Sequence, residues 1–590
     1  MANPLFSDRE VSFQLYEVHG AGDLCQLPAF ADHGRETFDL FLASARKIAR
    51  DVLFPAYRPM DAEPPRLEGG RVRVHPAMKE IWPRLVELGM TNATRPSEVG
   101  GQELPVLVAM FAGGYLSAAN GAATAYAGLT AGAAHLVEAF GSEEVRRTFH
   151  EPMISGRWSG TMALTEPHAG SSLADVRTTA TPMPAGPGRY LLRGNKVFIS
   201  GGDQDFTENI VHLALGRIEG APAGIKGISL FAVPRLRPED GRLVDNDCSS
   251  AGVFHKMGWR GIPSIALNFG ERGDCVGWVV GTPHQGLGHM FQMMNEARLM
   301  VGMNGVATAS AAYHESLEYA RTRPQGRPLA ARDPRTPQIP IVEHADVRRM
   351  LLKQKAIVEG GLSLLAECAR LADLVRHGPE EDRERRRMLL DLLTPVGKSF
   401  PAEAGFVSNS LAVQIHGGYG YTAEYLPEAW LRDQKLNSIH EGTTGIQSLD
   451  LLGRKVVAGG GDALRALAAE FAAVEATNEE RAGLGAALEK IAATTMELAQ
   501  RGLAGDRDGM LAHSVDYLDA FSVLVISWQW AKMAAAARRG LERDRASADF
   551  YRGKIAAARW FFANELPRVS TLCDICLTDA SFVEARPEWF

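Results

Sequence analysis

The stretch SIHEGTTGIQSLDLLGRK, residues 438–455, holds one carboxylate, Glu441, between a histidine and a Gly-Thr-Thr turn. A helical pattern begins directly after the turn, and we expect Ile446, Leu449 and Leu452 to form its buried stripe. Two interpretations fit this placement of Glu441. An acid near a helix N-terminus is stabilised by the helix dipole, whereas a carboxylate fixed by a rigid element beside a bound cofactor is suited to act as a catalytic base.

Two further stretches collect small and hydroxyl-bearing residues that let backbone N–H groups approach a ligand. The stretch GTMALTEPHAGSSLADVRTTA, residues 160–180, contains the hydroxyls of Thr165 and Ser171. The stretch QIHGGYGYT, residues 414–422, contains a glycine cluster that permits close approach of a phosphate. Taken alone, each stretch is also typical of a turn or of a tight junction between helices, so neither predicts a binding site by itself.

The sequence contains none of the common short motifs for nucleotides, zinc or acyl transfer. We find no G-x-G-x-x-G after a strand, no G-x-x-x-x-G-K-[ST], no H-E-x-x-H and no G-x-S-x-G. His440 and Glu441 begin like a zinc protease motif, but residue 444 is Thr, so the second metal ligand is missing. The sequence therefore predicts no metal site, and a flavin or nucleotide would be held without a Rossmann fingerprint.

The predicted secondary structure that must position these residues changes along the chain. In the first region Phe38, Phe41, Leu42 and Ala45 fall at the i, i+3, i+4, i+7 positions of an amphipathic helix. After residue 160 the chain becomes a series of short segments rich in β-branched residues, which indicate a small barrel or sandwich inserted between helical regions. We predict four domains: a helical domain with an N-terminal extension (1–160), a β-barrel domain (161–282), a helical bundle (283–458) and a C-terminal helical domain (462–590).

The length, net charge and composition of the chain limit the functions that it can have. A chain of 590 residues is too long for one hydrophobic core. Its net charge of −7 shows none of the excess positive charge that is typical of proteins that bind nucleic acid. The N-terminus has no signal-peptide pattern, and the apolar segment 521–540 is interrupted by polar residues, so we expect a buried helix there rather than a membrane span. Six scattered cysteines form no disulfide framework and favour a reducing cytoplasm.

Five stretches, in this order, resemble the acyl-CoA dehydrogenase family: MALTEPHAGSS, KVFISGG, YARTRPQGR, QIHGGYGYT and RDQKLNSIHEGTTGIQ. The resemblance covers about residues 36–456. It implies a mainly α fold with an inserted β domain, in which a helical domain, a β-barrel and a four-helix bundle follow one another. The N-terminal extension and the additional C-terminal helical domain resemble the longer bacterial branch, which includes enzymes acting on 3-methylmercaptopropionyl-CoA as well as fatty acyl-CoA dehydrogenases.

The resemblance implies FAD as cofactor and α,β-dehydrogenation of an acyl-CoA thioester to the trans-2-enoyl-CoA. Glu441 would remove the α-proton while the β-hydrogen leaves as hydride to flavin N5. The backbone N–H of Glu441 and a ribityl hydroxyl of FAD would polarise the thioester oxygen, where negative charge develops. We expect burial to raise the pKa of Glu441 and the following helix N-terminus to lower it.

The implied cofactor contacts lie within the quoted stretches. Phe198 matches the aromatic position that covers the isoalloxazine, where Trp is frequent, and Ser200 replaces the usual Thr. Arg323 and Gln325 match positions that reach the FAD of a neighbouring subunit. The complete implied set is Met162, Leu164, Thr165, Phe198, Ser200, Arg323, Gln325, Gln414, Gly417, Gly418 and Thr443.

The resemblance also implies contacts to the substrate. Ser171 matches a residue near the pantetheine, and Asn295 and Arg298 match polar positions on the CoA side; an internal ion pair of the bundle explains Arg298 equally well. His440 stands where Tyr is common, so it would contact substrate, titrate near neutrality or simply fill space. The family often carries Gly-Ser-Asp, whereas this chain has Ser172 in place of the carboxylate.

Three functions remain open at this point. The favoured one is a dehydrogenase that passes electrons to an electron-transfer flavoprotein. The alternatives are an acyl-CoA oxidase that uses oxygen and a non-catalytic flavoprotein of the same fold. We further expect a cytoplasmic homodimer, because the C-terminal helical domain would occupy surface that smaller tetrameric relatives use for assembly.

Overall fold

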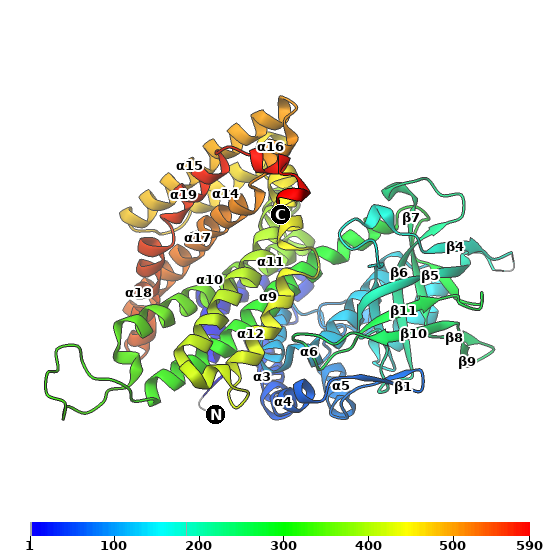
Figure 1. Cartoon of the computed structure of the whole chain (residues 1–590), viewed down its shortest axis with the longest axis horizontal. Coiled ribbons are helices and arrows are strands. Elements are labelled where there is room, and N and C mark those ends of the chain that lie inside the picture. Colours follow the sequence, from blue (N-terminus) through cyan, green and yellow to red (C-terminus); the bar gives the residue numbers. More distant parts are fainter. Residues whose placement is uncertain (1–2, 185) are drawn as a thin grey trace. The chain divides into compact units, whose positions relative to one another are not determined.

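The computed structural model describes residues 3–184 and 186–590, without the side chains of residues 292–294. The chain divides into two compact units (Figure 1). The helical unit contains Met1–Arg35, Pro105–Gly114 and Arg298–Phe590, and the barrel unit contains Glu36–Leu104 and Tyr115–Ala297. The division into four domains stays a prediction.

The sheet of the barrel unit closes on itself. In the ring, β5 (Arg189–Ser200) pairs with β12 (Val276–Val279), β12 with β7 (Ile228–Pro234), and β7 with β6 (Asn209–Ile218). The ring closes through β4 (Thr179–Pro182), which pairs with both β5 and β6. Outside it, β3 (Trp158–Ala163) pairs with β6, while β11 (Ser264–Phe269) joins β5 to β10 (Cys248–Val253). The predicted β-barrel between helical regions is therefore confirmed.

Apolar side chains cover both faces of β6. Ala214 packs with Phe231 and Leu192 in one core cluster, and Leu213 packs with Val137 of α6 (Val106–Phe140) in another. A strand buried on both faces has a nearly continuous apolar sequence rather than an alternating one, and NIVHLALGRI shows this pattern.

The amphipathic helix predicted after residue 35 is α3 (Arg35–Ile48). Phe38, Phe41, Leu42 and Ala45 are all buried, as the spacing predicts. The prediction of this helix is therefore confirmed. The apolar residues recur at helical spacing among charged ones, and burying them stabilises the helix more than its intrinsic propensity does.

The bundle of the helical unit is built from four helices: α9 (Gly286–Thr322), α10 (Ala345–His377), α11 (Glu380–His416) and α12 (Pro427–Lys435). Glycines allow two of them to approach closely. A Cβ added at Gly302 of α9 would lie 2.1 Å from the carbonyl oxygen of Gly397 of α11. Any side chain at Gly302 would therefore force these two helices apart.

The longer C-terminal helices also belong to this unit: α14 (Asp462–Ala472), α15 (Asn478–Leu503), α17 (Ser514–Arg543), α18 (Ala548–Asn564) and α19 (Arg568–Cys576). Helix α17 is the centre of the group and packs on α10, α18 and α19 (Figure 1). Its Trp528 and Trp530 are buried, and the Trp530 indole N–H donates to the Ala356 carbonyl oxygen of α10 at 3.2 Å. Residues 521–540 thus form a core helix of this unit.

Among the described residues, two helices are long and apolar enough to cross a membrane. They are Val106–Phe140 and Arg507–Arg543, and in each 67% of the most apolar window is buried inside the protein. The core helix of a soluble protein meets the same two criteria.

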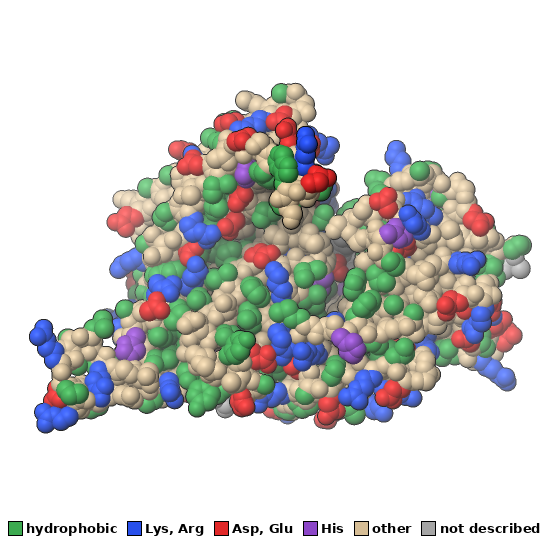
Figure 2. Space-filling model, viewed as in Figure 1, with side chains coloured by type: hydrophobic (Ala, Val, Ile, Leu, Met, Phe, Trp, Pro, Cys, Tyr) green, Lys and Arg blue, Asp and Glu red, His purple; other side chains and the backbone are tan. Residues whose placement is uncertain are grey.

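On the face drawn in Figure 2, Lys and Arg side chains lie among Asp and Glu side chains rather than in one patch.

Candidate functional site

Glu441 lies in a strained turn directly before a helix. Its φ is +53°, a left-handed value that is uncommon outside glycine. Helix α13 (Thr444–Asp450) follows, and the hydroxyl of Thr443 caps it by accepting the N–H of Ile446 at 3.3 Å. The side-chain amide of Gln447 donates to the carbonyl oxygen of Glu441 at 3.2 Å. The predicted helix start is confirmed, and the helix itself holds the turn that carries Glu441.

The predicted buried stripe of this helix is wrong at Leu449, which is 43% exposed, and Ile446 is only half-buried. The buried face instead contains Gln447, Ser448 and Leu451 together with the predicted Leu452. Polar residues lie on this face because each has a specific partner: Gln447 binds Glu441, and the Ser448 hydroxyl lies 3.0 Å from that of Ser514 on α17. A hydrophobic pattern does not reveal such pairs.

The electrostatic surroundings of Glu441 combine burial with two cations. The carboxylate is half-buried, and burial raises its pKa, while the positive charges of Arg298 and Lys398 oppose that rise. Arg298 is buried and its Nη1 lies 3.2 Å from the Asp450 carboxylate, so the internal ion pair that the sequence left open is present. The balance favours the raised pKa that a general base needs.

His440 does not titrate near neutrality. Burial lowers its pKa to about 3, and the neighbouring positive charge of Lys398 acts in the same direction. The ring is therefore neutral at physiological pH, and that part of the expectation is wrong, because a histidine exchanges protons there only when its charged form is solvated or paired.

In the barrel unit the structure brings two of the quoted stretches together. The N–H of Val197 in β5 donates to the carbonyl oxygen of Thr165, which follows β3, at 2.9 Å. The buried ammonium of Lys196 donates to the Leu164 carbonyl oxygen at 3.2 Å and to the Glu166 carboxylate at 2.8 Å. Met162, Leu164 and Thr165 are thus held beside the strand that carries Phe198 and Ser200. The sequence analysis missed Lys196 and Glu166.

Phe198 lies on a bulge of β5. The register with β11 shifts between Ile265, which faces Ile199, and Leu267, which faces Lys196. Phe198 has a φ of +60° and its ring is 61% exposed, resting on Phe254 with ring centroids 4.6 Å apart. Bulges re-aim side chains next to active sites, and a left-handed Phe stores strain of about 1–3 kcal/mol. The structure therefore presents an aromatic face outward, as a residue covering an isoalloxazine requires.

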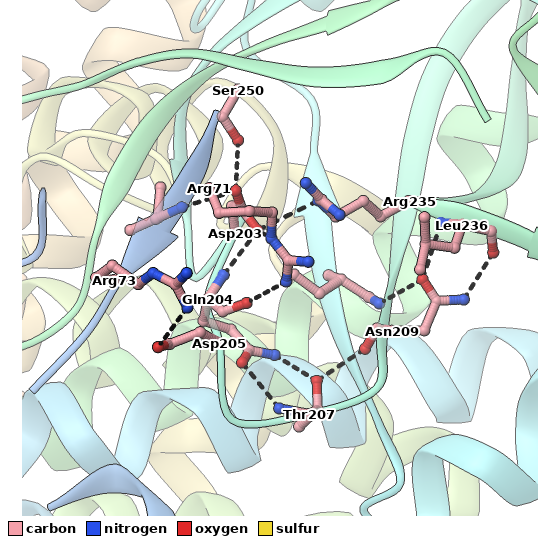
Figure 3. Close-up of polar contacts among 12 residues, drawn as sticks. Arg71, Arg73, Asp203, Gln204, Asp205, Thr207, Asn209, Arg235, Leu236 and Ser250 are labelled. Carbon is pink, nitrogen blue, oxygen red and sulfur yellow. Dashed lines mark hydrogen bonds and ion pairs between the residues drawn. The ribbon is translucent and has the colours of Figure 1, made fainter. Parts of the chain in front are cut away.

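The turn after β5 is held by Asp203, which no solvent reaches (Figure 3). Its carboxylate accepts the Ser250 hydroxyl at 2.9 Å and lies 3.4 Å and 3.3 Å from the Nε atoms of Arg71 and Arg235. The N–H of Val72 donates to the same carboxylate at 3.0 Å. This cluster anchors the hairpin of β1 (Arg66–Glu68) and β2 (Arg71–Arg73) to the strand end at Ser200.

The substrate-side residues of the barrel unit lie at or near its surface. Ser171 is exposed in the loop after β3, and Asn295 is half-buried in α9. Ser172, which stands in place of the family's carboxylate, donates its hydroxyl to the side chain of Asp175 in the same loop.

A second group of predicted residues lies on the surface of the helical unit. The Arg323 guanidinium is 6.0 Å from the Tyr419 ring centroid, which brings the end of α9 beside the glycine turn after α11. Gly417 has a φ of +60°, and a Cβ added at Gly417 or Gly418 would meet nothing within 4 Å. The open Gly417–Gly418 pair fits the pyrophosphate of a dinucleotide cofactor. The exposed residues of the group are Arg323, Gln325, Gln414, Gly417 and Gly418.

Apart from the substrate-side residues Ser171 and Asn295, the predicted site residues therefore fall into three groups. Glu441, His440, Thr443 and Arg298 lie at the α11–α13 end of the helical unit. The flavin-ring residues lie around Thr165 and Phe198 in the barrel unit, and the third group surrounds Gly417. The sequence analysis missed Lys398, which is fully buried in α11; a lysine between Val396 and Phe400 in an apolar helix was the available signal.

Comparisons with known proteins establish the family. Residues 35–157 match the model for "Acyl-CoA dehydrogenase, N-terminal domain", 284–456 match "Acyl-CoA dehydrogenase, C-terminal domain", and 463–585 match "Acetyl-CoA dehydrogenase C-terminal like". The chain belongs to the acyl-CoA dehydrogenase family, whose members are FAD-dependent oxidoreductases.

Individual relatives refine the comparison. The chain is 39% identical to 3-methylmercaptopropionyl-CoA dehydrogenase of Ruegeria pomeroyi, over 85% of each chain. It is 32% identical to a butyryl-CoA dehydrogenase of Syntrophomonas wolfei, over 100% of this chain and 99% of the relative. The crystal structure of an acyl-CoA dehydrogenase complexed with FAD from Bacillus anthracis has a TM-score of 0.74 at 20% identity, covering 96% of this chain and 91% of that one, and so shows the same fold.

Proposed function

We propose that this protein oxidises the α,β-bond of an acyl-CoA thioester to the trans-2-enoyl-CoA, with Glu441 as the base that removes the α-proton. The observation that carries the proposal is the setting of Glu441: a strained residue fixed at the start of α13, half-buried and flanked by Arg298 and Lys398. A solvated acid that only faces a helix dipole needs neither strain nor burial. Strain of this kind is concentrated at functional sites.

The residues of the chain supply positioning and charge. The backbone N–H of Glu441 is the donor that would polarise the thioester oxygen where enolate charge develops. The outward face of Phe198 and the Thr165 segment would hold the flavin ring, and the glycine turn at Gly417 would approach the pyrophosphate. FAD, when bound, supplies the two-electron acceptor for the oxidation.

We propose a fatty acyl-CoA or 3-methylmercaptopropionyl-CoA as substrate. Support comes from the names of the relatives at 39% and 32% identity, which act on 3-methylmercaptopropionyl-CoA and butyryl-CoA. An electron-transfer flavoprotein is the proposed acceptor, and the proposed assembly is a cytoplasmic homodimer without an integral membrane segment. The packing of α17 and α18 on α10 supports a dimer, since it occupies a bundle surface on which another subunit would otherwise pack.

An anaerobic titration of the FAD-loaded protein tests this function. The panel comprises butyryl-CoA, a long straight-chain acyl-CoA, isobutyryl-CoA and 3-methylmercaptopropionyl-CoA, and flavin absorbance reports reduction. We expect at least one of them to bleach the flavin, with slow reoxidation in air. Rapid reoxidation in air would favour an oxidase, and retention of oxidised flavin with every thioester would reject the dehydrogenase.

A further inference from the structure

Among the described residues, three lysines have no exposed surface: Lys196, Lys398 and Lys554. The ammonium of Lys196 lies 2.8 Å from the Glu166 carboxylate, and that of Lys554 lies 2.8 Å from the Glu359 carboxylate. The ammonium of Lys398 makes no hydrogen bond within the part of the chain that the structure describes. Burying an unpaired charge is costly, so Lys398 requires a functional explanation.

The surroundings of Lys398 are fixed by close helix packing. Its neighbour Gly397 is the residue whose carbonyl oxygen lies against Gly302 of α9, and Phe400 and Pro401 are buried one turn further along α11. The backbone of α11 therefore cannot shift to bring the ammonium toward solvent without separating α11 from α9.

Charged and titratable groups from three elements interact with Lys398. Glu403 lies one turn along α11, Arg298 comes from α9, and Glu441 and His440 come from the turn before α13. Two of these groups have partners of their own, although the Thr444 hydroxyl leaves the negative charge of Glu403 in place. The Glu403 carboxylate accepts the hydroxyl of Thr444, the first residue of α13, and the Arg298 guanidinium lies 3.2 Å from Asp450.

Glu441 is the second anion that acts on Lys398. Its carboxylate makes no hydrogen bond or ion pair with any of the described residues, although its backbone carbonyl oxygen accepts from Gln447. His440 is neutral and so adds no second positive charge beside Lys398. Glu403 acts on Lys398 more strongly than Glu441 does, and Arg298 acts on Glu441 more strongly than Lys398 does. Glu441 is nevertheless the anion near Lys398 whose carboxylate has no hydrogen-bond partner among the described residues, and it is half-buried.

We propose that Lys398 is a positioning residue for the base: its buried ammonium attracts the ionised carboxylate of Glu441 and holds it deprotonated and oriented before proton abstraction. The inference rests on the function proposed above. Burial lowers the pKa of Lys398 to about 8, partly opposed by Glu403 and Glu441. The ammonium therefore stays charged throughout the range in which a carboxylate of raised pKa titrates.

The sign of the effect of removing Lys398 follows from these charges. Burial raises the pKa of Glu441, and Arg298 and Lys398 lower it. Without Lys398, only Arg298 opposes burial, and Arg298 is neutralised in part by Asp450. The protonated, inactive form of Glu441 should then persist to higher pH, so the acidic limb of the pH–rate profile moves to higher pH.

The test compares full-length FAD-loaded wild type with Lys398→Met, using anaerobic flavin reduction by whichever acyl-CoA of the panel reduces wild type fastest. For Lys398→Met we expect the acidic limb to move up by about one pH unit or more, with rates converging on wild type near pH 9. Lys398→Arg, which keeps the cation, should return the limb to within about 0.3 units of wild type. An acidic limb that stays in place in Lys398→Met would overturn the inference, even if the rate falls.

A matched variant changes the neighbouring anion instead. Glu403→Gln keeps an acceptor for the Thr444 hydroxyl but removes a negative charge from Lys398. Its acidic limb should lie no higher than that of wild type, because Lys398 then acts on Glu441 alone; an upward shift would contradict the inference. This variant also carries the test if Lys398→Met does not retain FAD.

Failure of the inference is separable from failure of the proposed function. If no acyl-CoA reduces the wild-type flavin, the proposed function fails and the acidic limb is never measured. If wild type is reduced with an acidic limb that Lys398→Met leaves unchanged, the dehydrogenase stands and only the role of Lys398 is lost.

Discussion

The Lys196 ammonium lies 2.8 Å from the Glu166 carboxylate inside the barrel unit, and both side chains are almost completely buried. The same ammonium donates to the carbonyl oxygens of Leu164 and Leu215 at 3.2 and 2.7 Å. One cation therefore ties the loop after β3, which carries Thr165, to β5 and β6. A buried ion pair, in addition to apolar packing, therefore fixes the position of this loop.

Lys196→Met should destabilise the barrel unit strongly, because the Glu166 carboxylate would remain buried without its cation. Breaking a buried pair in this way costs about 3–5 kcal/mol. Chemical unfolding of the apoprotein measures the loss. The exposed Lys226→Met serves as control and should lie within about 0.5 kcal/mol of wild type; equal effects of the two variants would refute the anchoring role.

Phe198→Ala should weaken FAD retention by about tenfold or less, because it removes the aromatic face while keeping the strand. Phe198→Trp should retain FAD, since a larger ring preserves that face. The flavin-to-protein ratio after dialysis, and the rate of flavin release followed by fluorescence, measure the effect. Phe582→Ala, which removes a similarly exposed ring from the helical unit, is the control. Unchanged retention in Phe198→Ala would exclude Phe198 from the flavin site.

Asp373 gives the helical unit a specific pH dependence. Its carboxylate accepts the N–H groups of Val106 and Leu107 at 2.7 and 3.0 Å, at the start of α6. Burial raises its pKa to about 7, although these N–H groups and nearby arginines oppose the rise. The folded protein then binds a proton more tightly than the unfolded chain, so this contribution to stability is complete below about pH 4 and is lost as pH rises through 7.

Asp373→Asn removes that titration. The difference in free energy of unfolding between wild type and Asp373→Asn should shrink from pH 4 to pH 7.5, by up to about 4 kcal/mol. Urea unfolding of the apoprotein at a series of pH values measures it. The exposed Asp32→Asn is the control and should show no such trend; a difference for Asp373→Asn that is constant with pH would contradict the assignment.

Periodic patterns in the sequence predict the elements of this protein better than its site. The helical stripe of α3 and the short strands of the barrel are both apparent from residue type and spacing, because burial of apolar side chains determines them. The helix start at Thr443 is also readable, since a hydroxyl residue after a glycine is typical of a helix cap.

The details that shape the site depend on contacts between distant residues. The error at Leu449 arises because Ser448 finds a hydroxyl partner on α17 and Gln447 finds a carbonyl oxygen at Glu441. The bulge at Phe198 depends on the register of β11, about 65 residues further along the chain. The buried cation Lys196 interrupts no hydrophobic period, and Lys398 is readable only as a lysine inside an apolar helix. Family motifs indicated Glu441, but only the structure shows the charges around it.

The most direct test of the account is flavin reduction by acyl-CoA in Glu441→Gln. The amide keeps the size of the side chain and cannot accept the α-proton, so we expect the variant to fold and retain FAD, with reduction slowed by at least about 10³-fold. Glu381→Gln, an exposed position on α11, should be reduced at the wild-type rate. Reduction of Glu441→Gln within about tenfold of wild type would contradict the assignment of Glu441 as the base.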